Sequence, residues 1–319
     1  AFASEESNDV QFSVNAIRQV VNMMAGLDGR KYIVYISDGL PMVPGLGLMN
    51  EYSSLFRDSS MLSHRSRFDQ SRQFRSLVSA ANGQDISIYT IEAKGLEVRG
   101  ISAEHRYAPD PLTAAVTESN LEDPLFYMAD NTGGLAIVNT NDIGAGLDRV
   151  RDDLFSYYSI GYTINPSGQD KVHRIEVQVP DHGDHNLRYR RRFVEKSLES
   201  RIQDRVMTAL LFRVDENPMQ VDLDAGRASP ATSDRWSVPI HVSFPLRRVA
   251  LLPEGEDYVG RVVVFVAARD LEGKQSDLQR IEHEVRVPAA DYEEAQRRRF
   301  GIDLSLLMGE GSHRLSVGL

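Results

Sequence analysis

Acidic and hydroxyl side chains stand at the ends of two apolar runs, where they could bind a metal ion or transfer protons. The first run, residues 31–37 (KYIVYIS), ends at Ser37 and is followed by Asp38 and a glycine. The second, residues 86–92 (ISIYTIE), ends at Glu92. Carboxylate and hydroxyl oxygens suit Mg²⁺, so Asp38 with Ser37 is a candidate metal site. The alternative is that Asp38 only begins a turn before a glycine.

Glu92 could instead pair with Asp38 or Glu97 as an acid and a base, because two carboxylates at one sheet edge suit hydrolytic chemistry. No sequence motif supports that chemistry. The chain lacks Gly-x-Ser-x-Gly, a phosphate loop, His-Glu-x-x-His and a dinucleotide-binding fingerprint. A metal-dependent hydrolase is therefore the least favoured class of function, and we expect no enzyme.

A second cluster of metal-ligand types is the DHGDH stretch at residues 181–185. Two imidazoles and two carboxylates can hold a transition metal. Adjacent side chains in one turn rarely converge on an ion without ligands from elsewhere, so a solvated hairpin turn is the favoured interpretation.

Two basic clusters, RYRRRF at 188–193 and RRRF at 297–300, could face an acidic partner surface. Side chains alternate between faces along a strand, so each cluster is divided, and a solvated edge that discourages aggregation is the simpler interpretation. The net charge of −10 and the lack of interleaved stacking aromatics exclude a nucleic-acid binder.

The elements that must position these side chains follow from apolar spacing. Continuous β-rich runs predict buried strands, and helical spacing predicts amphipathic helices. Their alternation predicts parallel β-α-β units in an open, doubly wound sheet, with ligands at the carboxyl ends of the strands. The predicted strands are 31–37, 86–92 and 134–139, and the predicted helices are 10–26, 66–82, 117–131 and 141–158, with caps at Thr117 and at Asn141 or Asp142.

The second half of the chain has a different pattern of predicted elements. It begins with a predicted strand at 157–164, continues with a hairpin and a short helix at about 196–212, and becomes all strands and turns after Asn217. The predicted domains are a partial α/β domain (1–163), a β-hairpin extension (164–196), a helical connector (197–216) and a β-sandwich (217–319). Three aromatic residues on its strands are expected in the core: Trp236, Phe244 and Phe265.

The loop after Asp38, residues 39–50 (GLPMVPGLGLMN), is apolar and rich in Gly and Pro. It is either an exposed partner surface or a loop packed under the neighbouring helix. The first interpretation assigns these residues to partner binding: Leu40, Pro41, Met42, Val43, Pro44, Leu46 and Glu92.

The blocks GRKYIVYISDGLP (29–41) and TGGLAIVNTND with YYSIGYT (132–163) resemble the von Willebrand factor type A domain, in particular the VWFA-related bacterial proteins of the Acidobacteria type. The resemblance covers nearly all of the chain. It implies a partial, doubly wound parallel sheet of type A, then a β-hairpin and an immunoglobulin- or fibronectin-like sandwich.

Type A domains often bind Mg²⁺ at a metal-ion-dependent adhesion site, which begins with Asp-x-Ser-x-Ser. Only the last element of that site, Ser37-Asp38-Gly39, has a match. The resemblance therefore implies an incomplete site, with no cofactor held within this chain and Mg²⁺ only if further ligands lie upstream of Ala1.

Three strands with apolar faces make a small sheet core, so we expect further strands upstream of Ala1. In the sandwich, the last strand ends abruptly at Leu319, so we expect an open sheet edge at residues 312–319. The absence of cysteine and the triplet Ala1-Phe2-Ala3 favour export, and no apolar run is long enough to span a membrane. The expected function is a non-enzymatic protein-interaction or adhesion module of an exported bacterial protein. The alternative is a structural subunit of a larger assembly.

Overall fold

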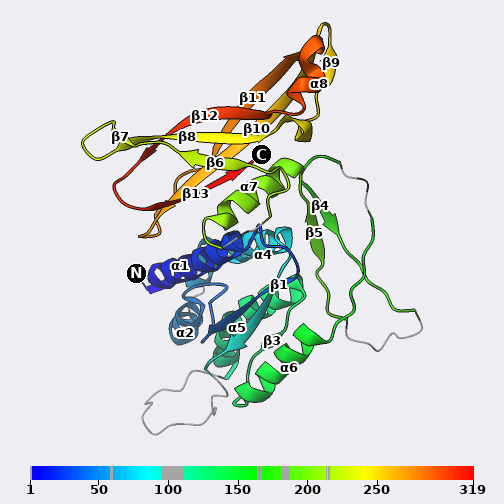
Figure 1. The fold of residues 1–319 in the computed structure, drawn as a ribbon. Helices are drawn as coiled ribbons and strands as arrows, with labels where there is room; N and C mark the ends of the chain where they lie inside the picture. The colour runs from blue at the N-terminus through cyan, green and yellow to red at the C-terminus, as the bar shows by residue number, and fades with distance from the viewer. Residues whose placement is uncertain are drawn as a thin grey trace. The chain divides into compact units, whose positions relative to one another are not determined.

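The computed structural model describes residues 2–57, 60–94, 111–163, 165, 167–180, 187–212, 214 and 216–319 (Figure 1). The chain divides into two compact units, Ala1–Ser197 and Leu198–Leu319. The fold is mixed α/β, with a three-stranded parallel sheet and antiparallel sheets among the described residues. No described helix combines the length and the apolar character needed to cross a membrane.

The parallel sheet of the first unit has the order β1-β2-β3. Its strands are β1 (Lys31–Ser37), β2 (Ile86–Glu92) and the short β3 (Ala136–Ile137). Ser37 lies opposite Glu92, and Ile91 lies opposite Ile137. The prediction of three neighbouring parallel strands is confirmed, although the third is shorter than expected.

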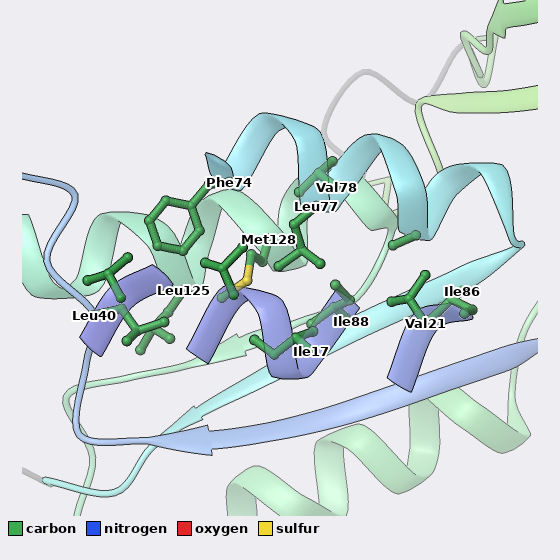
Figure 2. Close-up of a cluster of buried hydrophobic side chains, with 13 residues drawn as sticks. Ile17, Val21, Leu40, Phe74, Leu77, Val78, Ile86, Ile88, Leu125 and Met128 are labelled. Carbon is green, nitrogen blue, oxygen red and sulfur yellow. The ribbon is translucent and has the colours of Figure 1, made fainter. Parts of the chain in front are cut away.

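Helices cover both faces of β2, which explains its continuous apolar sequence. Ile86 and Ile88 point to one face, where α1 (Phe2–Met23), α4 (Ser71–Gly83) and α5 (Pro111–Thr132) share a core with them. Figure 2 shows side chains from these helices and from β2 pointing toward one another. On the other face, Tyr89 and Ile91 pack with Val150 of α6 (Ile143–Phe155), whose N-cap is Asp142.

The remaining elements of the first unit are short. They are α2 (Leu46–Phe56), η1 (Ser60–His64), α3 (Arg65–Phe68), β4 (Lys171–Arg174) and β5 (Arg192–Glu195), of which β4 and β5 form the predicted hairpin over only four residues each. The loop predicted to reach residue 50 ends earlier, because Gly45 takes a left-handed conformation (φ 76°) and α2 begins after it.

Two further expectations in this unit are wrong. Thr117 is not an N-cap: α5 already begins at Pro111, and the Thr117 hydroxyl donates to the Thr113 carbonyl inside the helix. The strand predicted at 157–164 is absent from its described residues, 157–163. No described strand pairs with that segment, and its tyrosine side chains are exposed.

A tight junction between α5 and β3 holds the centre of the sheet. The Thr132 hydroxyl accepts a hydrogen bond from the Ile88 amide at 2.8 Å and donates to the Met128 carbonyl at 2.8 Å. The backbone of Gly134 passes so close to β2 that a Cβ atom there would lie 2.0 Å from the Ile88 carbonyl oxygen. Only glycine fits at this position.

The second unit contains two antiparallel sheets, with orders β12-β8-β6 and β11-β10-β13. The first consists of β6 (Asp222–Ala225), β7 (Ser229–Pro230), β8 (Trp236–Pro245) and β12 (Arg299–Met308). The second consists of β9 (Leu252–Glu254), β10 (Asp257–Asp270), β11 (Gln279–Pro288) and β13 (His313–Gly318). Alternate side chains from both sheets form one buried core, including Val242 and Phe244 of β8, Val264 and Val266 of β10, and Ile302 of β12.

Helix α7 (Leu198–Ala209) covers the outer face of the second sheet. Val206 and Leu210 pack against Phe265 and Ala267, which are the β10 side chains that point away from the inter-sheet core. Both faces of β10 are therefore buried, which explains its unbroken apolar run. The sequence predicts this helix but not its packing. The unit also contains η2 (Leu246–Arg248), η3 (Ala289–Asp291) and α8 (Tyr292–Ala295).

Candidate functional site

The carboxyl ends of β1 and β2 bring the predicted site residues to one edge of the parallel sheet. The Ala93 amide donates to the Ser37 carbonyl at 2.8 Å, which ties the two strand ends together. The Ser37 hydroxyl accepts from the Gly39 amide and donates to the Gly39 carbonyl, both at 3.2 Å. Asp38 is exposed between them. The local geometry is that of a serine turn.

These residues do not assemble an ion site by themselves. The Ser37 oxygen is occupied by the turn, so Asp38 is left as the single carboxylate at this point. Within the described part of the chain, no group of three or more His, Asp or Glu side chains gathers in a way that could hold a metal. Among the described residues, Ser37 and Asp38 alone do not complete the Mg²⁺ site that the resemblance implies.

Glu92 belongs instead to a buried polar bridge. Its carboxylate accepts from the backbone amide of Asn139 at 2.9 Å, and the side-chain amide of Asn139 donates to Glu122 at 2.9 Å. Asn139 reaches both carboxylates because it takes a left-handed conformation (φ 55°) two residues after the end of β3. Glu92 and Glu122 are both buried, so Asn139 links β2, β3 and α5 through two acids.

Burial raises the pKa of Glu122, and the nearby charge of Glu92 adds to this, while the hydrogen bond from Asn139 opposes it. A raised pKa means that the folded protein binds this proton more tightly than the unfolded chain does. Ionisation of Glu122 therefore costs stability as the pH rises past the ordinary glutamate value near 4.5.

Glu122→Gln removes that charge but keeps an oxygen for Asn139. We expect it to raise the melting temperature of the first unit at pH 7 by roughly 2–4 °C and to change it little at pH 3.5, where the wild-type carboxyl is already protonated. The control is Asp123→Asn, at the neighbouring exposed carboxylate. The melting temperatures are measured by calorimetry at both pH values. Equal shifts in the two variants would contradict the raised pKa of Glu122.

The apolar loop after Asp38 is packed rather than exposed. Buried Asn120 of α5 accepts from the Val43 amide at 2.8 Å and donates to the Val43 carbonyl at 3.0 Å. The Met42 amide also donates to the Asn120 carbonyl at 2.8 Å. Leu40, Val43, Pro44 and Leu46 are buried, and Pro41 and Met42 are partly buried.

The loop thus adopts the second of the two interpretations, in which it packs against the neighbouring helix. Its apolar character follows from that packing, and a role in partner binding stays a prediction. The sequence did not reveal Asn120 or Glu122. A signal for Glu122 was present: extending the helical spacing of Met128 and Leu125 by three more residues reaches an acidic side chain on the buried face.

The other candidates give no second site. Glu97 and the DHGDH stretch at 181–185 lie outside the described residues. In the basic clusters, Arg188 pairs with Asp153 at 2.6 Å, and Arg299 pairs with Asp222 at 2.8 Å. In each cluster, one arginine is therefore paired with an acid of its own unit, which is what a structural role predicts.

The most unusual surface of the first unit is β1 itself. It is the end strand of its sheet, and no described strand pairs with its other edge. On the face opposite the main core, Tyr32, Val34 and Ile36 are 47%, 40% and 60% exposed. An apolar stripe beside an unpaired edge was not predicted, because the run KYIVYIS was expected to be covered on both faces.

No protein-family model matches the chain, and neither a curated protein nor a solved structure matches it. What can be said of function therefore depends on the geometry of the chain itself.

Proposed function

We propose that this protein is a non-enzymatic, protein-binding module and that it binds its partner along β1. The observation that carries the proposal is the exposed stripe of Tyr32, Val34 and Ile36 beside the unpaired edge of that strand. A free edge presents a row of backbone donors and acceptors that is complementary to another extended chain. Peptide recognition by strand addition uses both features, with backbone hydrogen bonds for affinity and alternate side chains for specificity.

The charges at the two ends of β1 help to orient such a partner. Arg30 lies before the strand and Asp38 lies after it, and both are exposed. The stripe between them is seven residues of strand in length. The partner surface that we infer is therefore an apolar β-strand segment with a polar residue at each end.

In this proposal the first unit is a type A-like domain, and the three parallel strands with helices packed against them support that assignment. In the same proposal, the two antiparallel sheets of the second unit form an immunoglobulin- or fibronectin-like sandwich. The protein acts outside the cytoplasm as an adhesion or interaction module, and Mg²⁺ takes part only where a partner or another segment supplies ligands beside Asp38.

A charge in the middle of the stripe tests the proposal. Val34→Lys should abolish partner binding, because a strand added at this edge would bury the ammonium group without a counter-charge. Val20→Lys is a closely matched control, since Val20 on α1 is 41% exposed and Val34 is 40% exposed. Both variants should fold normally.

Site-specific photo-crosslinking in the producing cells provides the measurement. A benzophenone amino acid at position 32 should form a protein adduct that Val34→Lys removes and Val20→Lys keeps. The same probe at Tyr52, which is 39% exposed on α2, should form none. Equal adducts from both positions, or an adduct that survives Val34→Lys, would show that β1 is not the binding surface.

The structural-subunit alternative predicts a different outcome of the same experiment. A permanent assembly would still form the adduct when irradiation follows purification and dilution, whereas a reversible binding module would form it only when irradiation takes place in the cells. Replacement of Glu92 by glutamine should leave the adduct unchanged, because Glu92 is buried in the bridge with Asn139.

A further inference from the structure

A groove in the second unit lies between its two antiparallel sheets. It has a volume of about 360 Å³, within the usual range of ligand-binding clefts. Its apolar wall includes Trp236 and Val238 of β8, Met308 of β12 and Leu315 of β13, and Glu310 and His313 stand at one end. Trp236, which the sequence places in the core, is 39% exposed here.

The same groove runs beside a free strand edge. One edge of β13 is paired with β10, from Asp270 opposite His313 to Phe265 opposite Gly318. No described strand pairs with its other edge, so the predicted open edge at residues 312–319 is confirmed. Leu315 contributes to the wall of the groove while its backbone belongs to this edge, so one ligand can occupy both.

These two features together select the shape of the occupant. The backbone groups of a free edge are complementary only to an extended chain, and the groove beside them accepts apolar side chains at every second position. The rim adds a charge preference. Glu310 is exposed and forms no ion pair with any described residue, so it favours a cation at that end of the groove.

We propose that β13 and the groove bind an extended segment of a second protein, about six residues long. Its apolar side chains alternate with polar ones, and a Lys or Arg lies beside Glu310. This surface belongs to the second unit and is separate from the one on β1.

The chain carries its own reporter for this site, because Trp236 is its single tryptophan. The probe is the synthetic peptide acetyl-KTVTVTV-amide, titrated into the full chain. Saturable binding should shift the tryptophan emission to shorter wavelength as the groove is filled. The peptide acetyl-KTVTPTV-amide should give no shift, since proline removes a backbone donor and blocks strand pairing.

Two variants locate the binding. Ala228→Phe places a ring in the groove and should weaken peptide binding at least tenfold, whereas Ala290→Phe, at an exposed alanine outside the groove, should leave it unchanged. Glu310→Lys should weaken binding of the lysine peptide and strengthen that of acetyl-ETVTVTV-amide. This exchange of preference does not depend on any loss of folding.

The proposal is overturned by an absent emission shift, by equal shifts from the proline peptide, or by Ala228→Phe behaving like Ala290→Phe. A shift that appears on raising the protein concentration without peptide, with a dimer in sedimentation, would identify a second copy of the chain as the occupant instead. Val34→Lys should leave the peptide response intact, so failure at one surface does not imply failure at the other.

Discussion

Replacement of Gly134 by alanine is expected to destabilise the first unit by more than about 4 kcal/mol, a value reached only when a substitution has no way to relax. The added Cβ would lie 2.0 Å from the carbonyl oxygen of Ile88, which is a backbone atom and cannot turn aside as a flexible side chain would. Separating them requires β2 and the segment before β3 to move apart. That movement would break the hydrogen bond from the Thr90 amide to the Leu135 carbonyl, which is 3.0 Å long.

Hydrogen exchange measured by mass spectrometry should show the effect as rapid exchange of the β2 amides. The control is Gly144→Ala on α6, where the nearest atom to a new Cβ is 3.4 Å away. Because alanine favours the helix more than glycine does, this change should stabilise the first unit by roughly 0.5–1 kcal/mol. Trp236 reports on the second unit, so its emission should remain native in both variants. Slow β2 exchange in Gly134→Ala would mean that this backbone contact is looser than described.

The second large effect is expected at Asn120. Its replacement by alanine would leave the buried Val43 amide without its partner and the Val43 carbonyl with the Leu46 amide alone, at 3.2 Å. The unsatisfied amide costs about 1–3 kcal/mol and the lost hydrogen bond to the carbonyl about 0.5–1.5 kcal/mol, so the total should be about 1.5–4.5 kcal/mol. The loop that follows Asp38 should become mobile at the same time, because the Asn120 side chain holds its centre.

Urea unfolding measures the change in the free energy of unfolding. The rate of proteolytic cleavage within the loop measures its local mobility. Ser119→Ala is the neighbouring control, since Ser119 is exposed and its hydroxyl donates to the exposed Asp123 carboxylate at 3.3 Å. Its effect should stay within about 0.5 kcal/mol. A free-energy change at Asn120 no larger than that of the control would refute a role of this side chain in holding the loop.

The two long parallel strands could be predicted to the residue, because each is a continuous apolar run with turn residues on both sides. β3 could not, since its sequence continues in β-favouring residues as far as Val138, while the left-handed Asn139 and the contact with Glu92 end the pairing. For the segment 157–163 the error is the reverse, because a strand was predicted and none forms. Its composition is that of a strand, but a strand exists only where another strand is available to pair with it.

The candidate site was predictable in position but not in chemistry. Strand ends in a parallel sheet place Ser37 and Glu92 together, as expected from topology. The hydrogen-bond partner of Glu92 is Asn139, which lies far along the chain, so no local sequence pattern could predict it. Likewise, the unbroken apolar run of β10 was assigned to one core, because nothing in that run indicates that a helix from residues 198–209 covers its other face.

The packing of α7 on β13 has a consequence for synthesis of the protein. The helix leaves the ribosome about one hundred residues before the strand that it covers, since the two begin at Leu198 and His313. Until β13 follows, Val206 and Leu210 lack part of the surface that buries them. The nascent second unit therefore exposes part of the apolar face of α7 to water until synthesis reaches β13.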